Sequence, residues 1–116
     1  MAVTLNKAAL KHARSLIKSG DFVADERDDW SEHAPSARTE NSYIKEHDFA
    51  DYGRWYLGVD KGAGEDTKER YSFPFGDFKK VHRCGVISLE TRAAQFDHTS
   101  IARAAKQLLE AIDAAN

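Results

Sequence analysis

The stretch RYSFPFGDFKKVHRCGV, residues 70–86, carries the strongest structural signals of the chain. Aromatic side chains alternate with smaller residues up to Phe75, and this period of two is typical of a β-strand with one apolar face. Pro74 has no N–H group to donate, so the strand should end there or lie at the edge of a sheet. A Gly-Asp pair then predicts a turn, and residues 79–82 predict a short returning strand. Because an isolated hairpin is only marginally stable, we expect helices to cover its aromatic face.

Aromatic residues are concentrated around this strand, since ten of the twelve lie between Trp30 and Phe78. Together with nearby cations they could stack on nucleic-acid bases. They could instead fill the core of a small sheet, which needs large side chains. The rings of Tyr71, Phe73 and Phe75 are spaced two residues apart and should point to one side. A core requires this arrangement, whereas a stacking platform would need that side to be open, so the spacing favours a core.

Positive charge is clustered after the predicted turn. The candidate anion or nucleic-acid patch consists of Lys79, Lys80, His82, Arg83 and Arg92. Lys79, Lys80 and Arg83 could instead form exposed ion pairs with the acidic segment 21–32, each worth a fraction of a kcal/mol. They also precede a predicted helix whose free N–H groups would favour a phosphate or a carboxylate. The same helix start could lower the pKa of Cys84, although a single cysteine is more often a small buried side chain.

The composition limits the classes of protein that the chain can form. Its 116 residues fit one domain, residues 1–116, with a core large enough to fold without a staple. A net charge of −2 counts against a dedicated nucleic-acid-binding domain, which usually carries a positive excess. The one cysteine excludes an internal disulfide, and no long apolar block indicates a signal peptide or a membrane span. We therefore expect a cytoplasmic protein that does not contact the membrane.

The first third of the chain predicts one helix and one connection. Residues 4–19 form the predicted helix, with Thr4 as its N-cap and Gly20 as its left-handed C-terminal cap. Its small, alanine-rich apolar face could pack on the core or lie on a membrane surface, and its composition favours packing. Residues 1–20 could nevertheless be loosely attached to the rest. Residues 21–35 are rich in Asp and Glu and predict a solvated connection.

The middle of the chain gives weaker signals. Residues 37–47 predict a short helix that starts at Ser36 or Thr39, and Asp48 with Asp51 resembles the cap of a second one. Residues 54–60 could be helix or strand, and we expect helix up to about Leu57. Residues 61–68 contain two glycines and several charges, which predicts a loop with one helical turn at its end.

The last third predicts a helical hairpin with a polar break at residues 97–100. The apolar positions at helical spacing are Val86, Leu89, Ala93 and Phe96 in the first helix, and Ile101, Ala104, Ala105, Leu108, Ile112 and Ala115 in the second. We expect these stripes to close over the aromatic strand. The predicted fold class is therefore α+β, with a small antiparallel hairpin or sheet packed against helices and a helical hairpin at the C-terminus.

Three segments also carry a resemblance to known proteins. They are NSYIKEHDFADYGRWYLGVD (41–60), EDTKERYSFPFGDFKKVHRCGVI (65–87) and RAAQF (92–96). The chain resembles a family of small uncharacterised bacterial proteins over about residues 30–113, through a shared aromatic-Pro-aromatic-Gly-Asp-Phe-Lys-Lys-Val-His-Arg core. A looser version of this pattern is similar to domains encoded near phage and prophage head-assembly genes. The resemblance implies a bacterial source and a compact module, and it carries over no catalytic residue.

The sequence contains no recognisable catalytic or metal-binding motif. Its five histidines are scattered without the spacing of a zinc-ligand set. The Glu-His-Asp run at residues 46–48 offers three metal-capable side chains, but neighbours on a helix point in different directions. The glycines at 62 and 64 lack the Lys-Ser/Thr that follows in a phosphate-binding loop. We therefore expect no catalytic residue, no metal and no cofactor.

These observations favour a non-enzymatic binding or assembly module whose partner is another protein or a second copy of the chain. A nucleic-acid-associated protein that uses the basic patch is the second hypothesis. A small-molecule enzyme is the third, because only a folded cleft could select a pair of carboxylates for acid–base chemistry.

Overall fold

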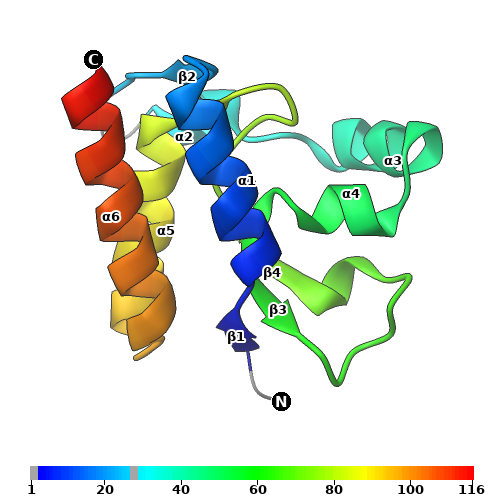
Figure 1. Ribbon diagram of the computed structural model, residues 1–116. Helices are drawn as coiled ribbons and strands as arrows, with labels where there is room; N and C mark the ends of the chain where they lie inside the picture. The colour runs from blue at the N-terminus through cyan, green and yellow to red at the C-terminus, as the bar shows by residue number, and fades with distance from the viewer. Residues whose placement is uncertain (1–2, 27–28) are drawn as a thin grey trace.

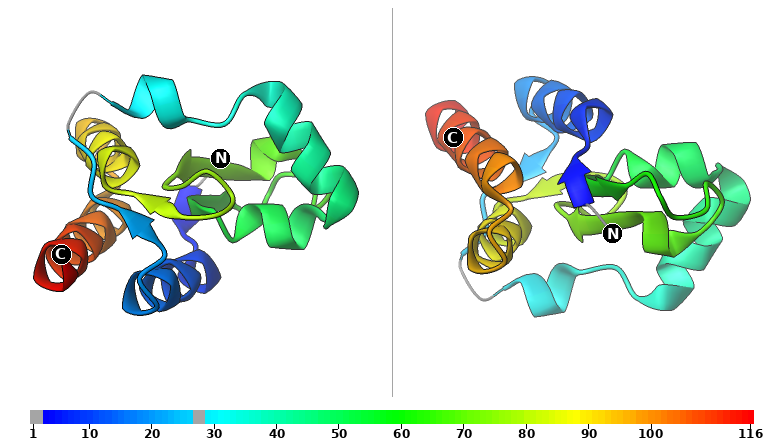
Figure 2. Two further views of the ribbon diagram at one scale, coloured as in Figure 1. Left: turned by 90° about the horizontal axis from the view of Figure 1, so that it is seen from above. Right: turned by 90° about the horizontal axis from the view of Figure 1, so that it is seen from below.

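The computed structural model describes residues 3–26 and 29–116, and it shows an α+β fold in which helices surround two small sheets (Figure 1). The elements in chain order are β1 (Val3–Leu5), α1 (Lys7–Lys18), β2 (Phe22–Val23), α2 (Trp30–His33), α3 (Ala37–Glu46), α4 (Phe49–Gly53), β3 (Tyr56–Asp60), β4 (Tyr71–Pro74), β5 (Val81–His82), α5 (Arg83–Gln95) and α6 (Thr99–Ala115). Helices α5 and α6 pack together beside α1, and α3 and α4 lie at the other end of the strands (Figure 2).

The main sheet has three antiparallel strands in the order β1-β3-β4. Pro74 closes the edge strand β4, as its missing N–H predicts. The returning strand is placed differently from the prediction for residues 79–82. β5 pairs in parallel with β2, with Val81 opposite Phe22, and only a bridge from Gly76 to Val81 joins it to the end of the first sheet. The fold therefore contains a second, two-stranded sheet that sequence spacing did not reveal.

Helix α1 begins later than the sequence predicts. Thr4 is not its N-cap, because β1 pairs with β3. Asn6 is the cap instead, and its Oδ1 accepts the N–H of Ala9 at 3.3 Å. Gly20, with φ +84°, ends the helix in the predicted left-handed conformation. The helix packs on the core as expected, through the buried side chains Ala9, Ala13 and Ile17.

The prediction of helix up to Leu57 is wrong. Residues 56–60 form β3, which is buried along its whole length and hydrogen-bonded to a strand on each side. The two neighbouring strands therefore override a local signal that favoured neither state. Gly58 allows β4 to approach, because a Cβ there would lie only 2.6 Å from the Oγ of Ser72.

The predictions for the segments on either side of β3 are confirmed. Helix α3 begins after Ser36, whose Oγ accepts the N–H of Thr39 at 3.2 Å. Helix α4 begins after Asp48, whose carboxylate accepts the N–H of Asp51 at 2.8 Å. The predicted loop at 61–68 ends in a short 3-10 helix, Lys68–Arg70.

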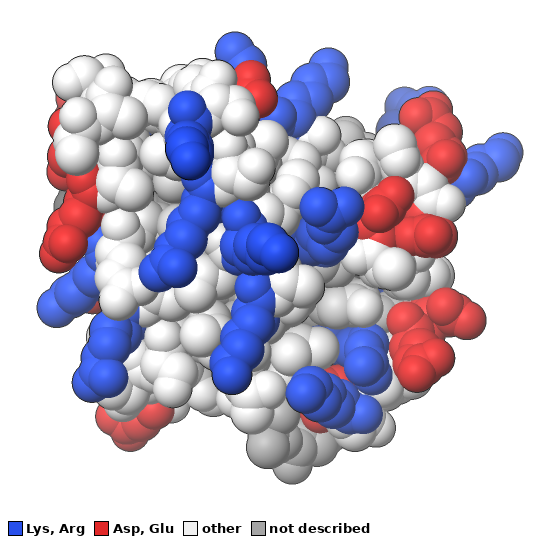
Figure 3. Space-filling model, in the orientation of Figure 1, with Lys and Arg blue, Asp and Glu red and all other residues white. Residues whose placement is uncertain are grey.

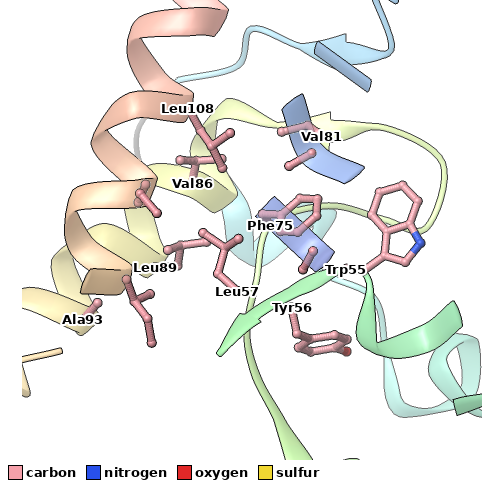
Figure 4. Packing of buried hydrophobic residues seen from close by; sticks show 14 of the residues in the cluster. Trp55, Tyr56, Leu57, Phe75, Val81, Val86, Leu89, Ala93 and Leu108 are labelled. Carbon is pink, nitrogen blue, oxygen red and sulfur yellow. The ribbon is translucent and has the colours of Figure 1, made fainter. Parts of the chain in front are cut away.

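The aromatic strand buries one of its three rings completely. Phe75 is 0% exposed and lies among Leu57, Val81 and the α5–α6 pair, at the centre of the core (Figure 4). Tyr71 and Phe73 are only half-buried. Phe73 has φ +62°, so the regular alternation of side chains breaks at this residue. The expectation that all three rings are shut away beneath the C-terminal helices therefore holds for Phe75 alone.

The C-terminal helical hairpin is confirmed. Its buried stripes are Val86, Leu89 and Ala93 on α5, and Ile101, Ala104, Ala105, Leu108 and Ile112 on α6. Phe96 does not belong to the stripe, because α5 ends at Gln95 and the Phe96 side chain is 59% exposed. Ala115, in the last turn of α6, is exposed as well. Among the helices of the described residues, none combines the length and the apolar composition needed to cross a membrane.

Replacing Gly76 with alanine is expected to lower the free energy of unfolding by about 1–3 kcal/mol. The new Cβ would meet the carbonyl oxygen of Lys80 and would lie 2.7 Å from Cζ3 of Trp55. The turn cannot easily shift, because Asp77 Oδ1 holds the N–H groups of the next two lysines at 3.0 and 2.8 Å. Urea unfolding measures the loss. Gly64→Ala, in the exposed loop, is the control, and a loss no larger than that of the control would contradict the prediction.

Candidate functional site

The structure places a buried histidine between two carboxylates. His82, the last residue of β5, has its Nδ1 2.7 Å from Oδ2 of Asp25 and its Nε2 2.9 Å from Oδ2 of Asp77. The side chains of His82 and Asp25 are only 5% and 8% exposed. Because both ring nitrogens face acceptors, both must donate, and the ring is an imidazolium. We call these three residues the Asp25–His82–Asp77 cluster.

The pKa shifts of the cluster agree with this charge state. Burial alone would lower the pKa of His82, but its hydrogen bonds to the two carboxylates outweigh burial and raise it above 6.5. For Asp25, burial is opposed by the N–H of Cys84 and by His82, and its pKa lies below the usual value. The pKa of Asp77 is lowered in the same way, by His82 and by the backbone N–H groups of the turn.

Local sequence explains how Asp77 and His82 meet. Asp77 lies in the turn after Gly76, where its Oδ1 accepts two backbone N–H groups and its Oδ2 is left to face His82. β5 follows at once and turns its last side chain inward, toward the same carboxylate. The sequence separation between the two residues is only five.

Asp25 reaches the cluster from a distant part of the chain. It follows β2, and the pairing of Val23 with His82 brings the two strands together. Its Oδ1 accepts the backbone N–H of Cys84 at 2.8 Å, so this carboxylate caps the start of α5. The sequence predicts that a phosphate or a carboxylate could bind at the start of α5. The structure shows that Asp25 of the same chain supplies a carboxylate there. The interpretation of residues 21–35 as solvated surface is wrong for Asp25, and Arg27 and Asp28 of that segment lie outside the described residues.

Cys84 is buried in the first turn of α5, next to Asp25. Burial and the neighbouring carboxylate raise the pKa of its thiol to about 12. The prediction that the helix start lowers this pKa is therefore wrong, because Asp25 already occupies the positive end of the helix. The alternative prediction, a small buried side chain, is confirmed. At neutral pH the thiol is protonated and is a poor nucleophile.

Helix α2 covers the cluster. The ring of His33 stacks on that of His82, with 4.9 Å between the ring centroids, and its Nε2 is 3.9 Å from Oδ2 of Asp25. Trp30 lies over Gly85, where a Cβ would come within 2.9 Å of the indole. Between α2 and α5 lies a pocket of about 450 Å³, whose lining includes Trp30, Cys84 and Arg92. Cys84 therefore connects the cluster to this pocket.

The five residues of the predicted basic patch have different environments. Lys79 and Lys80 are exposed, and Arg92 is exposed beside the pocket. Arg83 forms an ion pair with Asp113 of α6, with 2.9 Å between Nε and Oδ1, rather than with the acidic segment. His82 is turned inward and buried, so it is not available to an exposed anion or nucleic-acid patch. A phosphate-binding role for the three exposed cations stays a prediction.

Sequence reasoning missed the cluster because its two halves are separated by 57 residues. Nothing local distinguishes Asp25 from the other acids of its segment. A weak signal was available at the other half, where an aspartate in a turn is followed five residues later by a histidine at a helix start. Comparison of the chain with models of protein families, with curated proteins and with solved structures gives no match in any of the three. The resemblance to small bacterial proteins therefore stays a prediction.

Proposed function

We propose that the protein is a non-enzymatic binding and assembly module of the bacterial cytoplasm, which docks an acidic protein partner on helix α1. The observation that carries this proposal is a row of cations along that helix, which we call the α1 stripe: Lys7, Lys11, Arg14 and Lys18. All four side chains are exposed, and α1 contains no acidic residue. The view over α1 shows Lys and Arg across the middle of this face and Asp and Glu toward its edges (Figure 3).

The α1 stripe is presented on a rigid support. Its members are three or four residues apart, so they follow one line along the helix over roughly 16 Å. The opposite side of α1 is fixed in the core by Ala9, Ala13 and Ile17. Among the ion pairs of the described residues, none involves a member of the stripe. These charges are therefore available to a partner without first breaking an ion pair there.

The charge balance favours a protein partner over nucleic acid. The whole chain carries a net charge of −2, so the positive stripe is accompanied by excess negative charge elsewhere. A polyanion as long as a duplex would meet that negative charge as well, whereas an acidic protein surface can match the stripe alone.

Reversing two charges of the α1 stripe, in Lys11→Glu/Lys18→Glu, is expected to weaken binding to immobilised poly-L-glutamate about tenfold. Binding of the unchanged protein should fall steeply as salt is raised, because the contacts are exposed charges. The control is Lys79→Glu/Lys80→Glu, which makes the same change of charge in the turn before β5. Biolayer interferometry at two salt concentrations measures each variant.

Three outcomes separate the hypotheses. Loss of binding in the control but not in the stripe variant would contradict the proposal. Tighter binding to a single-stranded oligonucleotide than to poly-L-glutamate would put the nucleic-acid hypothesis first. Concentration-dependent mass in sedimentation, lost in the stripe variant, would identify the acidic partner as a second copy of the chain.

A further inference from the structure

The cluster around His82 contains more metal-ligating atoms than its hydrogen bonds use. One ligand atom from each of Asp25, His82 and Cys84 lies within 4.8 Å of the other two. The Nε2 of His33 is 3.9 Å from the same Asp25 oxygen that faces His82. Four atoms bound tetrahedrally to zinc at 2.0–2.3 Å lie roughly 3.3–3.8 Å apart. The distance from Asp25 to His33, at 3.9 Å, is near this spacing, whereas Asp25 and His82 are closer, at 2.7 Å, because they share a proton. Cys84 lies within 4.8 Å of Asp25 and His82, so small side-chain movements are needed to bring the four ligand atoms around one ion.

The types of donor fit zinc. One thiol, two imidazoles and one carboxylate are all ligands that zinc uses, and four protein ligands are typical of its structural sites. A metal-binding histidine usually donates its second N–H group to a carboxylate or a carbonyl, and Asp77 supplies that carboxylate here. His82 directs its second nitrogen to Asp77 at 2.9 Å, which fixes the tautomer that leaves Nδ1 for a metal. Asp77 is in turn held by two N–H groups of its own turn.

The proton between Asp25 and His82 lies where a cation would bind. In the metal-free protein, the imidazolium supplies the positive charge that the buried Asp25 carboxylate requires. A divalent cation can replace that proton and the thiol proton of Cys84, and the released protons go to solvent. Cys84 also lines the pocket between α2 and α5, so one of the four ligands borders this pocket.

We propose that Asp25, His33, His82 and Cys84 form a zinc-binding site, with Asp77 as the positioning residue that orients His82. The site joins the loop after β2 and the nearby helix α2 to the end of β5 and the start of α5, which are 57 residues away in sequence as measured from Asp25 to His82. Bound zinc therefore stabilises the fold by mass action, since the unfolded chain does not hold these four ligands together. The site is independent of the α1 stripe, and neither proposal rests on the other.

The test uses the full chain after treatment with a chelator. Zinc added in calorimetry is expected to bind one ion per chain and to raise the melting temperature. Cobalt, used as a coloured substitute, should give a thiolate-to-metal charge-transfer band, which must come from Cys84 because the chain has one cysteine. Cys84→Ser should abolish that band. Asp77→Asn should keep the band but weaken cobalt binding about 10–100-fold.

The matched control is His98→Asn, which changes a half-buried histidine at the start of α6 and should leave cobalt binding unchanged. The unchanged protein also provides a readout that needs no variant, because zinc should slow the reaction of Cys84 with a thiol reagent below the low rate that its burial already gives. Absence of both the cobalt band and thiol protection in the folded, unchanged protein would overturn the proposal. A cobalt band that survives in Cys84→Ser would overturn it as well.

Discussion

Replacing Phe75 with alanine is expected to lower the free energy of unfolding by about 3–5 kcal/mol. Phe75 is 0% exposed and lies at the centre of the core, between β3 and the α5–α6 pair (Figure 4). Its backbone is fixed on both sides, because its N–H donates to the carbonyl of Trp55 at 3.2 Å and its carbonyl accepts the N–H of His82 at 3.0 Å. The surrounding structure therefore cannot easily collapse into the cavity. Urea unfolding of the variant gives the loss.

Phe73→Ala is the matched control in the same strand. Its ring is half-buried and lies against His98, with 5.6 Å between the ring centroids, so less apolar surface is lost. We expect a loss of about half that of Phe75→Ala, following the smaller area removed from water. If Phe73→Ala cost as much as Phe75→Ala, the burial of these two rings would be assigned wrongly.

Replacing His82 with asparagine is expected to lower the free energy of unfolding by about 3 kcal/mol near pH 6, because the buried Asp25 carboxylate loses its positive partner. A second variant separates the effect of the lost charge from the effect of the changed side-chain shape. Asp25→Asn/His82→Asn removes both charges and should recover part of the loss, because no unpaired charge is left buried. If the loss in the double variant equalled the sum of the losses in Asp25→Asn and His82→Asn, the two charges would not be coupled.

The pH dependence of stability in the metal-free protein follows from the signs of the pKa shifts. The pKa of His82 is raised in the fold, so its contribution is complete below about pH 6.5 and is lost as pH rises through the raised value. The pKa values of Asp25 and Asp77 are lowered, so their contributions are complete above about pH 3.8 and are lost as pH falls further. The free energy of unfolding should be greatest between these limits.

Urea unfolding between pH 3 and pH 9 measures this profile. His82→Asn should flatten the alkaline side, because no imidazolium remains to lose its proton. A wild-type protein whose stability rises between pH 6 and pH 8 would contradict the assignment of a buried imidazolium.

The sequence predicts those elements that interactions between neighbouring residues determine. The caps at Ser36, Asp48 and Gly20 depend on a few neighbouring residues, and the structure contains all three. The periodic stripes of the C-terminal helices were visible for the same reason. β3 was missed because its state is decided by two strands, one of which lies more than 50 residues away in sequence. Strand pairing of that range leaves no trace in the spacing of the residues themselves.

The candidate site was predicted only in part. The sequence predicts a turn, a short strand and a helix start between Asp77 and Cys84, and the free N–H groups of that helix favour an anion such as the carboxylate that Asp25 supplies. The sequence could not show that Asp25 supplies it, because acids in a charged run look alike until the chain is folded. His82 was therefore grouped with the lysines before it, whereas β5 turns its side chain away from them and into the protein.

The buried imidazolium of His82, held between Asp25 and Asp77, underlies both the stability of the cluster and its pH dependence. Nitrogen NMR of the His82 ring in the metal-free protein tests this charge state directly. We expect both ring nitrogens to be protonated at pH 6, with a titration midpoint above the ordinary value of 6.5. A neutral ring at pH 6, with a midpoint below 6.5, would contradict this charge state.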